Sequence, residues 1–399
     1  MNQAVFSLVV TLCIQMLVSF GAVAGPVLAP IASQDLGLAA YLVGAYVAIM
    51  YLFAAVASLA SGGFILRFGP LRVSQVCLVF AAAGLAIVAL WGTPAGAIAS
   101  AALVGIGYGP VTPASSHLLA RTTPPDRINL VFSVKQTGVP FGNALAGVIL
   151  PALALALDWQ SAVLFSAVAC IIVAAASEPL RRALDTDLEV GRRLWAFHHI
   201  VGPLRLVFHM ADLRLLAFSS LFFGGMQTSL TTFLVTYLND RLGFSIVMAG
   251  LALTVAQAAG VVGRILWGYV ADRLVSPMRL LAGLALAMSA SAILVGLFTP
   301  SWPLAAILAV CASFGGTAIA WNGVLLAQVA RYSPPGRAGE VTGATTFMTF
   351  LGVTLVPGLF SAVLSTIGSY LVGYSAIGCT TLLTGLSCLR RDRRGARRR

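Results

Sequence analysis

The chain has 399 residues, of which 59% are hydrophobic and 9% charged, and its formal net charge is +12. A soluble domain carries about 25% charged residues, so this composition excludes one and indicates an integral membrane protein. The positive charges lie in short loops and in the C-terminal tail, a distribution typical of membrane topology and not of nucleic-acid binding.

Twelve apolar runs of about 20 residues or more follow one another, each long enough to cross a bilayer as a helix. Barrel strands would alternate apolar and polar residues, and these runs do not. We therefore predict an all-α integral membrane fold with twelve transmembrane helices. The first run is too long for a cleavable signal peptide. The predicted spans are 4–32, 38–66, 71–92, 95–119, 128–156, 160–180, 213–238, 246–271, 277–298, 302–330, 338–365 and 369–389.

The arginines of the loops predict the orientation of the chain. With the N-terminus inside, nearly all of them fall in cytoplasmic loops and the tail, and Arg241 is the exception outside. Basic loops stay in the cytoplasm. We therefore expect both termini there, in a multi-pass protein of the cell (inner) membrane that works as a monomer. The basic tail is expected to contact anionic membrane lipids.

The longest polar stretch divides six spans from six. It predicts an N-terminal six-helix bundle at 1–182, a cytoplasmic central loop at 183–212, a C-terminal six-helix bundle at 213–389 and a basic tail at 390–399. Within the loop, 194–201 and 204–209 are expected to lie on the membrane surface as a short amphipathic helix. The halves also repeat, because Arg121-Thr-Thr-Pro-Pro-Asp-Arg127 returns as Arg331-Tyr-Ser-Pro-Pro-Gly-Arg337. Two parallel halves are typical of a transporter with its site at the midplane.

Two cations lie inside predicted spans. Lys135, the only lysine of the chain, lies within an apolar run, and Arg264 lies in a second. A cation at that depth costs about 2.5–3.5 kcal/mol on insertion scales. No aspartate or glutamate lies at similar depth in the predicted spans, so we expect an anion to be their partner. Counted from Arg127 and Asp272 at about 1.5 Å per residue, both lie about 12 Å from the same membrane face.

Other partners for these cations stay open at this point. Either side chain can bond backbone carbonyls or extend toward the cytoplasmic interface, and Arg264 is near enough in sequence to pair with Asp272. His117 is expected to be a packed histidine rather than a proton relay. The cysteines and histidines form no cluster with the spacing of metal ligands, so we expect no metal, no cofactor and no disulfide.

Two loops carry a resemblance to a known family. Gly268-Tyr-Val-Ala-Asp272-Arg273 resembles the loop 8–9 signature of the major facilitator superfamily, and Gly62-Gly-Phe-Ile-Leu66-Arg67-Phe-Gly69-Pro-Leu-Arg72 resembles its loop 2–3 counterpart. Leu66 stands where the first copy should have an acid, and Val275 stands where the second should have a glycine. The twelve spans and the repeat extend the resemblance over the whole chain.

The resemblance also suggests a branch of the superfamily. Gly263-Arg264-x3-Gly268-x3-Asp272 resembles the helix-8 pattern of monocarboxylate and oxalate/formate porters, in which the arginine binds a carboxylate. A lysine on helix 5 is not part of that pattern. Gly138-Val-Pro140-Phe-Gly142 faintly resembles the helix-5 signature of proton-driven exporters, with different spacing.

In the superfamily, spans 1, 4, 7 and 10 line the central cavity, and spans 5 and 8 are neighbours. The resemblance therefore implies a substrate site that includes Arg264, Gln15, Tyr108, Gln227, Gln257, Trp321 and Asn322, and the charge argument alone adds Lys135. It also implies a gate at the cytoplasmic ends of the helices, in which acids pair with loop arginines. The candidate pairs are Asp272 with Arg331 and Glu340 with Arg67, beside Arg273.

These features predict a secondary transporter that moves a small organic anion, a mono- or dicarboxylate, by rocker-switch alternating access. Whether a proton accompanies the anion is left open. The alternative is a multidrug or metabolite efflux antiporter, but exporters of lipophilic cations generally need a membrane-embedded carboxylate. A lipid flippase of the same fold is a further alternative. The sequence has no nucleotide-binding loop or nucleophile motif, so we expect no enzymatic activity.

Overall fold

The computed structural model describes residues 3–37, 42–189, 191 and 197–396, and every regular element in these ranges is a helix. Eleven helices are long and apolar enough to cross a membrane, or twelve if the bent pair Val201–His209 and Ala211–Arg241 is one span. The predicted all-helical multi-pass fold is thereby confirmed, with eleven to twelve candidate spans. Residues 194–196 of the predicted surface segment and 397–399 of the tail lie outside the described residues.

The helices group into two compact units. Unit 1 comprises Met1–Pro124, Lys135–His209 and Ser333–Phe347, and unit 2 comprises Pro125–Val134, Met210–Tyr332 and Met348–Arg399. Each unit therefore includes a short segment from the other half of the sequence. The predicted bundle boundaries at 182 and 213 stay a prediction.

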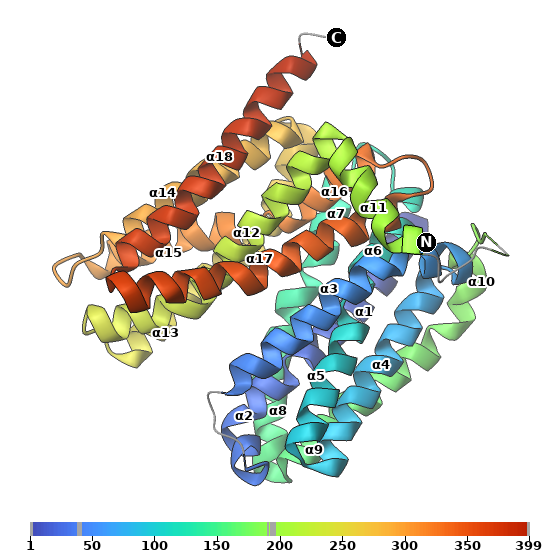
Figure 1. The fold of residues 1–399 in the computed structure, drawn as a ribbon, viewed down its shortest axis with the longest axis horizontal. Coiled ribbons are helices and arrows are strands. Elements are labelled where there is room, and N and C mark those ends of the chain that lie inside the picture. The colour runs from blue at the N-terminus through green and yellow to red at the C-terminus, as the bar shows by residue number, and fades with distance from the viewer. Residues whose placement is uncertain (1–2, 38–41, 190, 192–196, 397–399) are drawn as a thin grey trace. The chain divides into compact units, whose positions relative to one another are not determined.

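In unit 1, α4 packs along α5 and α9, and α1 packs along α8 (Figure 1). The helix α7 (Ile128–Gln136) begins in unit 2 and ends in unit 1. The other elements are α1 (Gln3–Ala22), α2 (Ala24–Asp35), α3 (Val43–Phe68), α4 (Pro70–Trp91), α5 (Pro94–Tyr108), α6 (Val111–Thr122), α8 (Gly138–Ala156), α9 (Trp159–Ala176), η2 (Glu178–Leu180), α10 (Arg181–Leu184) and α11 (Phe197–His209).

In unit 2, α14 packs along α18 and α15, and α13 packs along α15 (Figure 1). The helix α17 (Ala338–Ile367) begins in unit 1 and continues into unit 2. The other elements are α12 (Ala211–Thr236), the π-helical turn η3 (Tyr237–Arg241), α13 (Ile246–Arg273), α14 (Pro277–Gly296), α15 (Leu304–Ala318), α16 (Asn322–Tyr332) and α18 (Tyr370–Ala396).

Four of the predicted spans are broken near their middle. Proline explains three of the breaks, because its ring nitrogen cannot donate to the carbonyl four residues earlier. Pro26, Pro113 and Pro140 follow the breaks that separate α1 from α2, α5 from α6 and α7 from α8. The fourth break, between α15 and α16, has no proline. Broken helices expose backbone groups, and transporters use such places to bind substrate and ions.

Glycines let several helices approach to backbone contact. A Cβ atom built on Gly315 of α15 would lie 1.9 Å from the carbonyl oxygen of Ala256 on α13. A Cβ built on Gly352 of α17 would lie equally close, 1.9 Å, to the carbonyl oxygen of Leu221 on α12. Small residues at such crossings stabilise membrane bundles through close packing.

Gly315→Ala should therefore lower the melting temperature of the purified protein, because the added methyl group must push α15 away from α13. Overpacking of this kind costs about 1–3 kcal/mol. The matched control is Gly283→Ala on α14, where nothing lies within 4 Å of the built Cβ. Equal melting temperatures for the two variants would contradict the backbone contact.

Candidate functional site

Lys135 lies in the last turn of α7, in the interior of unit 1, and is only 2% exposed. Its Nζ donates to Oε1 of Gln15 at 2.7 Å and to Oε1 of Gln136 at 2.9 Å. These two acceptors are amide oxygens and carry no formal charge. The structure thus brings together two of the residues that the sequence predicted for the substrate site.

Gln15 joins three helices of unit 1. Its Oε1 also accepts from Oγ1 of Thr112 on α6 at 3.2 Å, and its Nε2 donates to Oγ of Ser19 at 3.3 Å. A carbonyl oxygen has two lone pairs, so the bonds from Lys135 and Thr112 fix the orientation of this carboxamide. Tyr108, at the end of α5, is half-buried, and its ring meets that of Tyr51 edge to face at 6.3 Å.

The position of Lys135 follows from local sequence. Pro140 leaves the carbonyl of Gln136 without its helical donor and produces the break at Thr137. Beyond the break, α8 runs against α1, because a Cβ on Gly142 would lie 2.1 Å from the carbonyl oxygen of Met16. This close approach holds the end of α7 beside Gln15.

Arg264 is buried in unit 2, with 2% of its surface exposed. Its Nε donates to the carbonyl oxygen of Ile319 at 3.0 Å, and Nε1 of Trp267 donates to that of Gly316 at 2.7 Å. Ile319 lies in the break between α15 and α16. Arg264 therefore makes a bond to a backbone carbonyl, one of the alternatives left open by the sequence, and this bond stabilises the broken span.

The same break carries two more predicted site residues. Nδ2 of Asn322 donates to Oε1 of Gln227 on α12 at 3.2 Å. The ring of Trp321 is 1% exposed and packs edge-on against Phe223, with centroids 5.6 Å apart. Its indole Nε1 has no hydrogen-bond partner among the described residues. A buried donor left unpaired costs about 1–3 kcal/mol, so an acceptor is expected here.

The remaining predicted site residues are placed separately. Gln257 on α13 is exposed, and no hydrogen bond within the described ranges involves its side chain. Lys135 belongs to unit 1, whereas Arg264 belongs to unit 2. A site shared by these two cations stays a prediction.

Asp272, predicted as a gate residue, caps a helix. Its carboxylate accepts from the backbone N–H of Asn129 at 3.1 Å, from Nδ2 of Asn129 at 2.8 Å and from the backbone N–H of Leu130 at 2.8 Å. These groups belong to the first turn of α7, where N–H groups have no partner within the helix. The predicted ion pair with Arg331 is not formed within the described residues, because backbone donors take the carboxylate and Arg331 is exposed.

Glu340, the second predicted gate acid, is 3% exposed and accepts from Nε of Arg337 at 2.6 Å. A Cβ on Gly62 would lie 2.5 Å from its Cγ. Likewise, a Cβ on Gly268 would lie 2.7 Å from Ser133 of α7. The two copies of the loop signature thus pack in the same way.

The arginines of the predicted gate differ in exposure. The guanidinium of Arg67 is half-buried and lies over the ring of Phe68, 5.4 Å from its centroid. Arg273 is exposed. The pairing of Glu340 with Arg67 stays a prediction.

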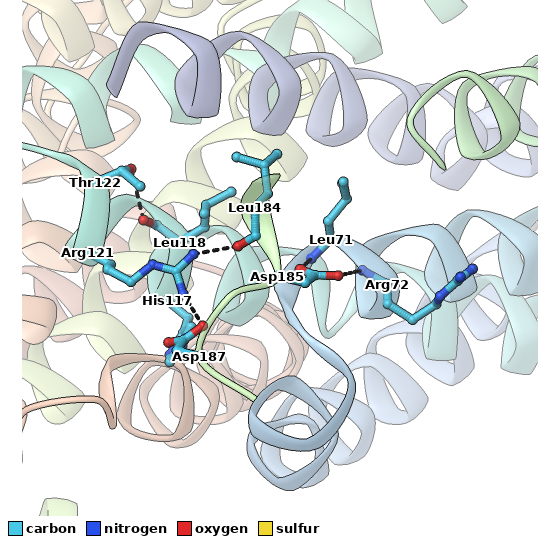
Figure 2. Close-up of polar contacts among 9 residues, drawn as sticks. All are labelled: Leu71, Arg72, His117, Leu118, Arg121, Thr122, Leu184, Asp185 and Asp187. Carbon is cyan, nitrogen blue, oxygen red and sulfur yellow. Dashed lines mark hydrogen bonds and ion pairs between the residues drawn. The ribbon is translucent and has the colours of Figure 1, made fainter. Parts of the chain in front are cut away.

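Sequence reasoning missed the segment at 185–189 of unit 1, in which Asp185 and Asp187 bind other parts of the same unit (Figure 2). Oδ1 and Oδ2 of Asp185 accept from the backbone N–H groups of Leu71 and Arg72, at 2.8 and 3.0 Å. Gly69 precedes α4 with φ +96°, and a Cβ there would lie 2.2 Å from Cγ of Asp185. A remote carboxylate therefore caps a helix whose own N-cap residue has no side chain. This capping contact could not be predicted from the sequence, because Asp185 and the start of α4 are close only in the folded chain.

Asp187 makes the second contact of this segment (Figure 2). Nε2 of His117 lies 2.7 Å from its Oδ2, and a carboxylate can only accept, so the ring nitrogen donates. Arg121 bonds both Asp187 and the carbonyl of Leu184. The bond from His117 and the charge of Arg121 hold the pKa of Asp187 well below its ordinary value, against the opposing effect of burial. His117 is packed, as predicted, at 4% exposed.

The spans, their breaks and the repeated loop contacts agree with one family. The sequence profile of the Major Facilitator Superfamily matches residues 8–357. The chain belongs to this superfamily. Its members are transporters and not enzymes, so the expectation of no enzymatic activity is confirmed. The narrower porter branch suggested by the helix-8 pattern stays a prediction.

Relatives within the superfamily are distant. An uncharacterised MFS-type transporter of Mycobacterium tuberculosis strain CDC 1551 / Oshkosh is 25% identical over 277 residues, which is 66% of this chain. The counterpart in strain H37Rv gives the same 25% identity over 277 residues. The match spans only 58% of the length of these relatives.

Solved structures of superfamily members share the fold over nearly the whole chain. The E. coli fucose:proton symporter FucP superposes with a TM-score of 0.77 at 14% identity, covering 98% of this chain and 99% of that one. The human organic anion transporter MFSD10 gives 0.74 at 17% identity, covering 97% and 99%. The proton:xylose symporter XylE gives 0.71 at 16% identity, covering 98% and 96%.

In this superfamily member, Asp272→Ala should loosen the start of α7, because two backbone N–H groups lose their acceptor. A lost N-cap costs about 0.5–2 kcal/mol. Hydrogen exchange of the peptide that contains Asn129 and Leu130 should become faster. Asp126→Ala is the control, since Asp126 is exposed and its nearest cation is the neighbouring Arg127 at 3.5 Å. Unchanged exchange in Asp272→Ala would refute the cap.

Asp187→Asn should destabilise the protein by about 1 kcal/mol at neutral pH, a small value because this ion pair is partly solvent-screened. The folded-state pKa of Asp187 is depressed, so its contribution is fully present above the unfolded pKa of about 3.9. It is lost as the pH falls toward the folded pKa. The difference in melting temperature between wild type and variant should therefore shrink below about pH 4. A difference that grows on acidification would contradict this assignment.

Proposed function

We propose that the chain is a secondary transporter that moves a small organic anion across the membrane by alternating access. The ammonium of Lys135 carries the proposal, because it is 2% exposed inside a span and bonded to Gln15 and Gln136. A cation in a transmembrane helix is costly and is retained where it serves a substrate or ion pathway. The resemblance of the Arg264 pattern to carboxylate porters makes a mono- or dicarboxylate the cargo.

The bonds of Lys135 suit exchange with a substrate. Gln15 and Gln136 each accept through a neutral amide oxygen. A carboxylate oxygen in place of either one places a full negative charge opposite the ammonium, so that both partners of the hydrogen bond are ionised. Thr112 keeps the Gln15 carboxamide oriented, so the ammonium stays in place when the substrate leaves.

Unit 2 supplies further groups that suit an anion. The indole N–H of Trp321 is a buried donor without a partner among the described residues. Asn322, Gln227 and Arg264 are polar groups on the same break or bonded to it. We assign these residues to the substrate together with Tyr108 and Gln257. This assignment does not require that these residues bind the same ligand molecule as Lys135, and it uses no distance between them and Lys135.

The fold itself does not select the cargo. The matched structures include proton symporters of sugars and, in MFSD10, an organic anion transporter. The buried cation and not the fold therefore carries the anion proposal. In this proposal the protein lies in the cell (inner) membrane, and the arginine-rich loops keep both termini on the cytoplasmic side. The protein works as a monomer, and its cytoplasmic gate consists of Asp272, Arg273, Arg331, Glu340 and Arg67.

Lys135→Gln should abolish transport, because it removes the positive charge and keeps a polar side chain. A thermal-shift screen against small carboxylates, phosphates, sulfonates and amines first identifies a ligand, since a ligand of the folded state raises the melting temperature. Uptake of that ligand is then measured in proteoliposomes with and without a pH gradient. Arg241→Gln removes a cation elsewhere and is the matched control.

Trp321→Phe keeps the ring and removes the N–H donor. It should weaken binding of the same ligand about tenfold, as expected for loss of one bond to a charged group.

Two outcomes would overturn the anion assignment. One is full uptake by folded Lys135→Gln, and the other is a screen in which only amines stabilise the protein.

A further inference from the structure

A groove with a volume of about 550 Å³ runs along α12 and α18 within unit 2. These two helices pack against each other, and α18 is the red helix that carries the C-terminal end in Figure 1. One end of the groove is lined by Arg214, Arg390 and Arg391. Toward the other end the lining includes Phe218, Phe222 and Leu383. The groove is therefore basic at one end and apolar along its length.

The excess of positive charge at the basic end rests on Arg390. Arg391 donates to Asp212 through Nε at 2.5 Å and Nη2 at 2.8 Å, so the carboxylate of Asp212 offsets the charge of Arg391. The next acid of α18, Asp392, is bonded to Nε of Arg279 at 2.5 Å and to Ser276 at 2.7 Å. Arg390 is exposed and forms no ion pair within the described part of the chain.

The rest of the groove offers little to a polar ligand. Thr380, Thr384 and Ser387 line it, but each hydroxyl donates to a carbonyl of its own helix, at 2.8, 2.7 and 2.8 Å. The apolar lining is open, since Phe218 is 39% and Leu383 is 64% exposed. A free phosphate would use only the arginines and leave this apolar surface uncovered.

The dimensions match one leaflet of a membrane. Leu383 and Arg391 are eight residues apart on α18, which corresponds to about 12 Å. The hydrocarbon of one leaflet is about half of a 30 Å core, or roughly 15 Å. An acyl chain that begins at the arginines can therefore lie along the groove without leaving its leaflet.

We propose that this groove binds one anionic phospholipid. Its phosphate lies at Arg214 and Arg390, and one acyl chain packs on Phe218, Phe222 and Leu383. Guanidinium groups match phosphate oxygens in charge and geometry, and basic pockets between membrane helices bind anionic headgroups. A zwitterionic lipid has the same chains but no net charge to meet the excess at the mouth.

The test uses the full-length protein in detergent, with native mass spectrometry and melting curves as readouts. Dioleoyl phosphatidylglycerol should bind and raise the melting temperature, whereas dioleoyl phosphatidylcholine and inorganic phosphate should not. Arg214→Gln with Arg390→Gln should weaken phosphatidylglycerol binding at least tenfold. Arg393→Gln is the control, because Arg393 is an exposed arginine of the same helix and does not line the groove.

A second comparison needs no variant and stays decisive if the double variant fails to fold. A phosphatidylglycerol with six-carbon chains should bind the wild-type protein at least tenfold more weakly than the dioleoyl lipid, because it lacks most of the acyl contact. Equal effects of phosphatidylglycerol and phosphatidylcholine would overturn the proposal. So would stabilisation by inorganic phosphate alone, or a loss in Arg393→Gln as large as in the double variant.

Discussion

Backbone N–H groups at helix starts need acceptors, and one helix start in each unit obtains them from a distant part of the chain. The first turns of α4 and α7 receive carboxylates from Asp185 and Asp272, which lie 114 and 143 residues away in sequence. Each carboxylate accepts from two successive backbone N–H groups. The charge also complements the positive end of the helix dipole. The starts of α4 and α7 are thus fixed by long-range contacts and not by local caps.

The repeat within the chain is visible in these contacts as well as in sequence. Gly268 lies against Ser133 and Gly62 lies against Glu340, so the same close packing occurs once in each unit. The chemistry has diverged. In the second copy the acid Asp272 lies on the helix that carries the glycine, whereas in the first copy Leu66 occupies that place and the opposing helix carries Glu340. Two copies of one scaffold therefore keep a carboxylate at each contact by different routes.

The sequence predicted much of this fold because hydropathy is a local property. The predicted span 246–271 corresponds to α13 at Ile246–Arg273, and the prolines at 26, 113 and 140 explain three of the breaks. Lys135 and Gln15 were both expected at the site and are bonded. The partners of Asp272 and Arg264 were not predictable in this way. Charge pairing favoured Arg331 for the acid, but backbone groups compete for both side chains, and their positions depend on tertiary packing. The 185–189 segment gave no sequence signal, since its acids acquire meaning only beside Leu71 and His117.

Lys135 is the only lysine, and its amine is almost fully enclosed by protein. A neutral amine attacks the acyl carbon of an acylating reagent, so this side chain reacts only when water and the reagent reach it. One position of the chain can thereby report on hydration of the interior of unit 1, without any engineered label. The rate at which Lys135 is acylated therefore measures how often the interior of unit 1 opens to solvent.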